Sequence, residues 1–309
     1  MCDLTDPIFQ DENKAREYLE AQRWPDGPIC PHCGSTEASH LTGKSHRPGL
    51  YQCNACRQQF TVTVGTVFER SKIPLHKWLL ATRLLSSSKK GFSAHQLHRT
   101  LGVTYKTAWF MAHRIREAMK DDDPGPMGGR GKIIEADETY TGPGEYKFVN
   151  KKGWKKIQGL GHKYKVVTLV ERDGSARSFH VDRVTSHQVR DILVKNAHRK
   201  STLVTDEANV YKPVGREFHK HWSVNHSIHQ WAIGKWAHTN TIEGFFSIFK
   251  RGMKGIYQHC GEKHLSRYLA EFDFRYNTRK LDDTERTKKA LEGIAGKRLT
   301  YRRVGVGAY

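Results

Sequence analysis

The chain has 309 residues, enough for two or three domains with one sizeable core among them. Lysine and arginine together number 52 against 32 aspartate and glutamate residues, a formal net charge of +20 that favours a polyanionic partner, above all nucleic acid. No apolar run approaches the roughly 18–20 residues that a membrane-spanning helix requires, and the acidic N-terminus is unlike a secretory signal, so we expect a cytoplasmic protein without a membrane partner.

Residues 1–68 begin with a short amphipathic helical stretch and then carry two C-x-x-C pairs. Two such pairs supply four thiolates, the number that a tetrahedral structural Zn²⁺ requires. A redox motif would need only one pair, beside a βαβ unit. The pattern therefore predicts an N-terminal zinc ribbon that holds one zinc ion. Its expected ligands are Cys30, Cys33, Cys53 and Cys56.

Residues 69–120 have the pattern of a helix-turn-helix. Ser93 and Thr104 can each cap a helix, and Gly102 falls where a tight turn between two helices needs a glycine. The outward face of the second helix would then read DNA, although an ordinary helical hairpin with a basic surface remains the alternative interpretation. The expected DNA contacts are Lys106, Thr107 and Arg114.

Residues 121–131 include D-D-D-P-G-P-M-G-G, a composition typical of a linker, and a second domain with a basic tail is expected over 132–309. The segment K-I-I-E-A-D-E-T-Y predicts a buried strand that carries Asp137, and S-T-L-V-T-D predicts another apolar strand that ends at Asp206. A predicted hairpin and a crossover helix lie between them. This order favours an α/β domain with a mixed sheet, in which the two strands lie side by side and the two carboxylates converge.

A lysine-rich loop precedes the predicted hairpin, and histidines are frequent between residues 219 and 238. Lysine runs usually form a solvated face, but beside an acidic site they could hold phosphates. No histidine pair has the helical i, i+4 spacing of a known zinc motif, so we expect these histidines to lie beside DNA rather than to bind metal. The lysines assigned to DNA are Lys151, Lys152, Lys155 and Lys156.

The stretch H-T-N-T-I-E-G-F-F-S-I-F-K-R (238–251) separates into two faces when it is drawn as a helix. Glu243 and Lys250 fall on one polar stripe, and the isoleucine and phenylalanine side chains lie on another side, where they would face a core. Asn240 as N-cap and Glu243 fit a capping box, which is a purely structural role. Alternatively, Glu243 and Lys250 could hold a metal ion and a phosphate together, provided that other carboxylates need a third partner.

Together these segments resemble bacterial insertion-sequence transposases of the DDE type, specifically the ISXO-type group with a zinc-ribbon head. The resemblance extends over nearly the whole chain. Its motifs are R-W-P-D-G-P-I-C-P-H-C-G (23–34), Y-Q-C-N-A-C-R-Q-Q-F-T-V (51–62), E-A-D-E-T-Y (135–140), V-T-D (204–206), H-T-N-T-I-E-G-F-F-S (238–247), F-K-R-G (249–252) and Y-L-A-E-F-D-F-R-Y-N (268–277).

The resemblance implies an RNase H-like fold and a transposase that binds the terminal inverted repeats of its element. It also implies DNA cleavage and strand transfer with two Mg²⁺ ions, for which Mn²⁺ could substitute, and a homo-oligomer assembled on element ends and target DNA. The acidic triad of the family maps onto Asp137, Asp206 and Glu243, with Lys250 as the basic residue seven positions on. Further DNA contacts are expected from His238, Asn240, Lys250 and Arg251.

Two other functions stay open at this point. A DNA-binding regulator descended from a transposase would keep the fold without the chemistry, and the intact acidic triad argues against it. A host nuclease of RNase H-like fold would recognise the structure of its DNA substrate and not a particular sequence. Such an enzyme would have less need of a ribbon and a helix-turn-helix.

Overall fold

The structure is a computed structural model that describes residues 4–142, 146–149, 153–157, 159–234 and 236–300. The chain forms two compact units, one made of residues 1–120 together with 280–309 and the other of residues 121–279. Within the described part of the chain, no helix is both long and apolar enough to cross a membrane.

The zinc-ribbon end of the first unit is built from one helix and a small antiparallel sheet in the order β1-β2-β3. Their bounds are α1 (Glu12–Arg23), β1 (Ala38–His40), β2 (Tyr51–Cys53) and β3 (Gln59–Phe60). The rings of Trp24, Tyr51 and Phe60 pack together. The ring centroids of Trp24 and Tyr51 lie 5.6 Å apart, and those of Tyr51 and Phe60 lie 5.7 Å apart. Three short strands bury little apolar surface, so this aromatic cluster provides much of the core here.

The first unit continues with α2 (Leu75–Ser87), α3 (Ala94–Leu101) and α4 (Tyr105–Ala118). Both predicted caps are confirmed: the Ser93 hydroxyl accepts from the Gln96 N–H, and the Thr104 hydroxyl accepts from the Thr107 N–H. Gly102 ends α3 with φ +61°, a left-handed conformation that glycine adopts without strain.

The sequence predicts residues 280–309 as the end of the second domain, whereas the structure groups them with the first unit. Helix α9 (Asp283–Glu292) is the reason. Its Leu291 is buried, as is Leu79 of α2, and both side chains line one small cavity. The segment therefore joins the core around α2.

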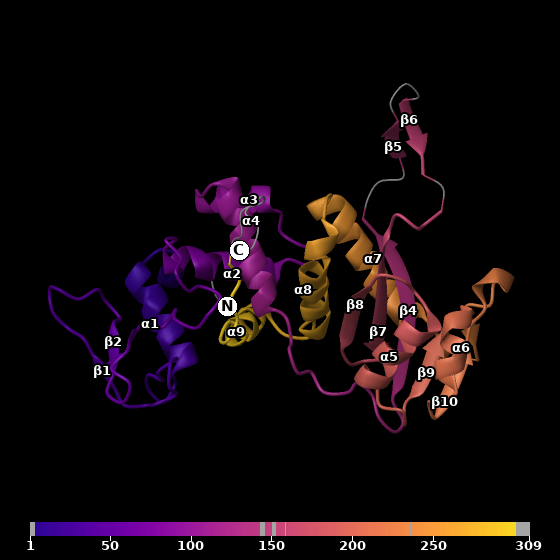
Figure 1. The fold of residues 1–309 in the computed structure, drawn as a ribbon, viewed down its shortest axis with the longest axis horizontal. Helices are drawn as coiled ribbons and strands as arrows, with labels where there is room; N and C mark the ends of the chain where they lie inside the picture. The colour runs from indigo at the N-terminus through magenta and orange to yellow at the C-terminus, as the bar shows by residue number, and fades with distance from the viewer. Residues whose placement is uncertain (1–3, 143–145, 150–152, 158, 235, 301–309) are drawn as a thin grey trace, which may run out of the picture. The chain divides into compact units, whose positions relative to one another are not determined.

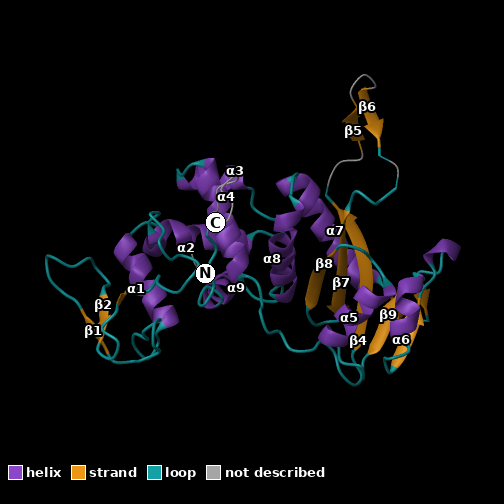
Figure 2. Ribbon diagram, in the orientation of Figure 1, coloured by secondary structure: helices purple, strands orange, loops and turns teal. Residues whose placement is uncertain are grey.

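The second unit contains a five-stranded mixed sheet in the order β10-β9-β4-β7-β8, visible in Figures 1 and 2. The strands are β4 (Ile133–Thr141), β7 (Tyr164–Glu171), β8 (Ala176–Val181), β9 (Thr202–Thr205) and β10 (Lys220–Ser223). Strands β4, β7 and β8 pair antiparallel in sequence order, while β9 lies parallel to both β4 and β10. This is the predicted RNase H-like mixed sheet.

Helices cover both faces of the sheet. They are α5 (Ser186–Asn196), α6 (Lys212–Gly215), α7 (Asn240–Gly252) and α8 (Leu265–Asn277). Ile134 and Ala136 of β4 pack in one apolar cluster with residues of α5, and α7 and α8 form a second cluster with β7. Since side chains alternate along a strand, Glu135 and Asp137 face α7.

Two small hairpins are attached to this unit. The first, β5 (Tyr146–Val149) with β6 (Gly153–Lys156), is inserted between β4 and β7 and projects beyond the sheet in Figure 1. The second, β11 (Ala232–Ile233) with β12 (Ala237–His238), leads into α7. The remaining turns are η1 (Pro7–Phe9), η2 (Asn209–Tyr211), η3 (His226–Ile228), η4 (Met253–Tyr257) and η5 (Glu262–His264), of which η4 is π-helical and the others are 3-10.

Candidate active site and metal centre

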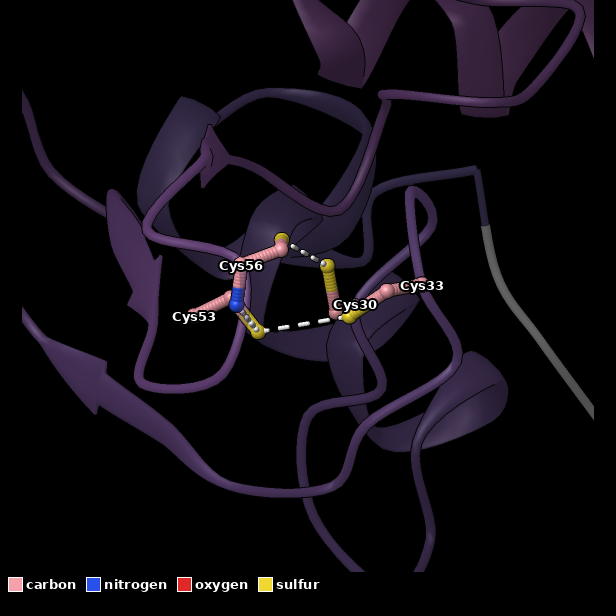
Figure 3. A group of neighbouring side chains, drawn as sticks. All are labelled: Cys30, Cys33, Cys53 and Cys56. Atoms are coloured by element: carbon pink, nitrogen blue, oxygen red, sulfur yellow. Dashed lines mark hydrogen bonds between the residues drawn. The ribbon is translucent and has the colours of Figure 1, made fainter.

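The four predicted zinc ligands meet at one point of the ribbon (Figure 3). The Sγ atoms of Cys30 and Cys56 lie 3.7 Å apart, and those of Cys33 and Cys53 lie 3.6 Å apart. A tetrahedral Zn²⁺ with Zn–S bonds of about 2.3 Å places its sulfur ligands about 3.8 Å apart. The Cys56 N–H also donates to the Cys53 Sγ, and this bond is the largest of several contributions that lower the pKa of the Cys53 thiol to about 6. The predicted cysteine cluster is confirmed, and its geometry fits zinc.

We expect the variant Cys53→Ser to lose its zinc and to unfold the ribbon. A closed site of four thiolates supplies on the order of 10 kcal/mol of folding free energy in small zinc domains. Elemental analysis and limited proteolysis would follow the change, with Cys260→Ser as the control because Cys260 lies outside the cluster. Folded wild-type protein that contains no zinc would refute the assignment.

The predicted DNA-reading residues of α4 differ in their exposure. Lys106 is exposed, and Thr107, next to the helix cap Thr104, is half-buried. The expectation that Arg114 faces DNA needs correction, since only 8% of this residue is exposed. Its guanidinium donates to the backbone oxygens of Glu69 and Leu299, both at 3.1 Å, and burial lowers its pKa.

We therefore expect Lys106→Ala and Arg114→Ala to act differently. Lys106→Ala should weaken DNA binding at unchanged thermal stability, whereas Arg114→Ala should cost stability on the order of 2 kcal/mol, because buried hydrogen bonds to a charged group are lost. Thermal melting and a DNA-binding titration would separate the two effects. If both variants lose binding equally and neither is destabilised, Arg114 contacts DNA and the correction is wrong.

In the second unit, the two predicted aspartates converge, as expected from the pairing of their strands. Strand β4 lies parallel to β9 with Glu135 opposite Val204, and the same register carried two residues further sets Asp137 beside Asp206. Carboxylate oxygens of Asp137, Asp206 and Glu138 all lie within 4.8 Å of one another. Burial, followed by the charges of Asp206 and Glu138, raises the pKa of Asp137 to about 8. Burial also raises the pKa of Asp206.

Glu138 joins this group although the sequence pattern does not predict it. Neighbouring residues of a strand point to opposite faces, so alternation separates Glu138 from Asp137. Strand β4 continues past Thr205, where β9 ends, and the side chains of Asp137 and Glu138 both approach Asp206 just beyond that end. The Tyr211 hydroxyl donates to the Glu138 Oε2 at 2.8 Å and fixes this carboxylate.

Glu243 lies on the first turn of α7 and is not a member of that group of three carboxylates. Its charge is the smallest of the contributions that raise the pKa of Asp137. The Thr239 hydroxyl donates to the Glu243 Oε1 at 2.8 Å, and the His226 Nε2 lies 3.7 Å from the same oxygen.

The structure contradicts the capping-box interpretation of Asn240 and Glu243. Thr239 is the N-cap residue, its side chain makes no capping hydrogen bond, and Asn240 is the first residue of the helix and is exposed. The helix begins one residue earlier than the capping-box pattern requires, so Glu243 does not close a capping box with Asn240 and instead accepts from the Thr239 hydroxyl.

The N-terminus of α7 is capped instead by Glu135 of β4, a residue that is fully buried. The Glu135 Oε2 accepts from the Ile242 N–H at 2.9 Å, and Oε1 accepts from the Thr241 hydroxyl at 2.8 Å. Arg172 neutralises the carboxylate, with Nε and Nη2 at 3.0 Å and 2.6 Å from Oε1. A carboxylate is favourable at a helix N-terminus, so Glu135 holds α7 against the strand that carries Asp137.

The remaining predicted DNA contacts have mixed outcomes. His238 is half-buried, and both its carbonyl oxygen and its Nδ1 face Arg172, so we assign it to this internal network instead of to DNA. Lys155, Lys250 and Arg251 are exposed. Lys151 and Lys152, together with the side chain of Lys156, lie outside the described residues.

Comparison with known proteins agrees with this architecture. Residues 10–59 match the transposase zinc-ribbon domain, and residues 128–277 match the ISXO2-like transposase domain. The chain is 26% identical over 295 residues to a Halobacterium salinarum protein described as an uncharacterized protein in transposable element ISH50, with 92% of this chain and 97% of that protein covered.

Two solved structures of the Mos1 transposase are also similar to the chain. One is its paired-end complex with the left transposon end, with a TM-score of 0.29, 12% identity, and 70% of this chain and 74% of that chain covered. The other is the mariner Mos1 paired-end complex with Mg, with a TM-score of 0.24, 14% identity, and 72% and 80% covered. The fold assignment rests on the strand order given above. Because the ribbon and transposase domains together match more than half of its residues, the chain belongs to the ISXO2-like transposases with an N-terminal zinc ribbon.

Proposed function

We propose that this transposase binds the terminal inverted repeats of its insertion sequence and catalyses metal-dependent DNA strand cleavage and strand transfer. The observation that carries the proposal is the meeting of Asp137 and Asp206 on neighbouring parallel strands. On the same face of the sheet, α7 presents Glu243 and is fixed to β4 by Glu135.

The residues at this site fit a divalent metal ion. Mg²⁺ and Mn²⁺ prefer carboxylate oxygens, and the acidic groups come from separate elements, as a two-metal phosphodiester site requires. Burial and the charges of Asp206 and Glu138 raise the pKa of Asp137, and a bound cation would favour its charged form. We propose that Asp137, Asp206 and Glu243 hold two ions, which when bound would activate the attacking hydroxyl and stabilise the leaving 3′-oxygen.

Exposed positively charged side chains of this unit would position DNA. Lys250 lies seven residues after Glu243, about 10 Å along the same face of α7, and its exposed ammonium group suits a phosphate contact. We assign the same role to Arg251 and Lys155, and a polar DNA contact to Asn240. Joining requires both ends of an element to be held together, so we propose that more than one copy assembles on DNA.

The experiment uses full-length protein and DNA fragments that carry matched inverted repeats from the flanks of its gene. We expect preferential binding to those ends, and strand cleavage at the ends with Mg²⁺ but not with a chelator. Binding without cleavage would favour a catalytically silent regulator. Cleavage with no preference for the ends would favour a host nuclease.

A further inference from the structure

Two tryptophans are unusually exposed in the segment that leads from β10 into α7. Trp231 and Trp236 expose 56% and 41% of their surface, although tryptophan has much to gain from burial. Trp231 directly precedes β11 and Trp236 directly precedes β12, and we call these two residues the tryptophan rim. Large exposed apolar groups commonly mark a binding surface.

The segment with the tryptophan rim is fixed to the acidic site at both ends. At its start, Glu207, the neighbour of Asp206, accepts from the N–H of His226 at 3.0 Å and from the Ser227 hydroxyl at 2.6 Å. At its end, Arg172 donates to the backbone oxygen of Trp236 while it pairs with Glu135. The two indoles are therefore presented on a segment that the active site itself positions.

A short chain of contacts joins the rim to Glu243. The ring centroids of Trp231 and His226 lie 4.9 Å apart, and the His226 Nε2 lies 3.7 Å from the Glu243 Oε1. One imidazole ring thus separates the Trp231 indole from the proposed third carboxylate. A phosphate held at the carboxylates would have its neighbouring nucleotides within reach of the rim.

We propose that the tryptophan rim binds unstacked nucleobases next to the phosphate that is cleaved or joined. The partner follows from the site that the rim adjoins and from the net charge of +20, which favours a nucleic acid over an apolar protein surface. Indoles stack on the face of any base, but bases within an intact duplex have no free face. The ligand is therefore a single-stranded or flipped nucleotide at a DNA end.

The test rests on the proposed function for its choice of DNA, but it measures binding in a chelator, without cleavage. Full-length protein is titrated with three forms of one end: blunt, with a short single-stranded overhang, and with the same overhang made abasic. We expect wild-type protein to bind the overhang about tenfold more tightly than its abasic form, the contribution of a stacked base. Trp231→Leu should remove this preference, while Trp231→Phe should retain part of it.

Leu160→Ala is the matched control, since Leu160 is another exposed apolar residue of the same unit. If wild-type protein binds the overhang and its abasic form equally, the proposal is overturned, and this comparison needs no folded variant. It is also overturned if Trp231→Leu keeps the preference, or if that change alters only self-association. If wild-type protein prefers the overhang to its abasic form but never cleaves DNA, the proposed function fails while the proposed binding role of the tryptophan rim stands.

Discussion

Replacement of Glu243 by glutamine should lower strand cleavage and joining roughly a thousandfold or more, while binding to DNA ends persists. Glutamine keeps the shape of the side chain, and its carbonyl oxygen can still accept the hydrogen bond from Thr239. The amide lacks the negative charge that offsets a divalent cation. Misplacing one ion should remove several kcal/mol of transition-state stabilisation. End cleavage and joining with Mg²⁺, measured together with thermal melting, would show the effect.

Ser247→Ala is the control for this change, because Ser247 lies one turn further along the same exposed face. It should leave stability and cleavage close to wild type. Near-normal joining by Glu243→Gln would mean that Glu138, which already lies with Asp137 and Asp206, is the third carboxylate.

Asp137→Asn should abolish cleavage and yet stabilise the metal-free protein. The pKa of Asp137 is about 8 in the folded chain, mainly because the carboxyl is half-buried and partly desolvated, against about 3.9 for an unfolded aspartate. Between these two values the folded state holds a proton that the unfolded state has released. Stability of the metal-free wild type should therefore fall as pH rises from about 4 to about 8. Asparagine does not ionise, so the variant should lack this contribution.

Thermal melting in a chelator across this pH range would measure the difference, with Asp182→Asn as a control at an exposed aspartate after β8. Added Mg²⁺ should raise the melting temperature of the wild type at pH 8 more than that of Asp137→Asn. Parallel pH profiles for wild type and Asp137→Asn would show that the Asp137 carboxyl does not govern stability.

The parts of the site that were predictable from the sequence depend on strand pairing and cysteine spacing. Two apolar strands, each carrying an aspartate, with a crossover between them, lead to neighbouring parallel strands and hence to the meeting of Asp137 and Asp206. The two C-x-x-C pairs likewise lead to the cluster of four sulfurs. Local patterns suffice in both cases, because the residues that determine each arrangement lie in the motifs themselves.

The features that were missed depend on contacts between segments distant in sequence. Arg114 is buried because it bonds to Glu69 and Leu299, far from α4 along the chain. The role of Glu135 as a cap emerges only when α7 is placed against β4. Glu138 approaches Asp206 because β9 ends at Thr205, before Asp206. Strand alternation alone predicts that Glu138 points away from Asp137.

The most direct test of the proposed catalytic site is the metal dependence of cleavage in wild-type protein and in Asp206→Asn, on one end-containing DNA. Asp206 stands at the end of β9 beside Asp137, so loss of its charge should weaken the hold on the ions. We expect wild-type protein to cleave at the element end with Mg²⁺ or Mn²⁺ and to be inactive with a chelator. Asp206→Asn should bind the same DNA without cleaving it. Cleavage that persists in the chelator, or that is equal in wild type and Asp206→Asn, would contradict a metal-dependent site at these carboxylates.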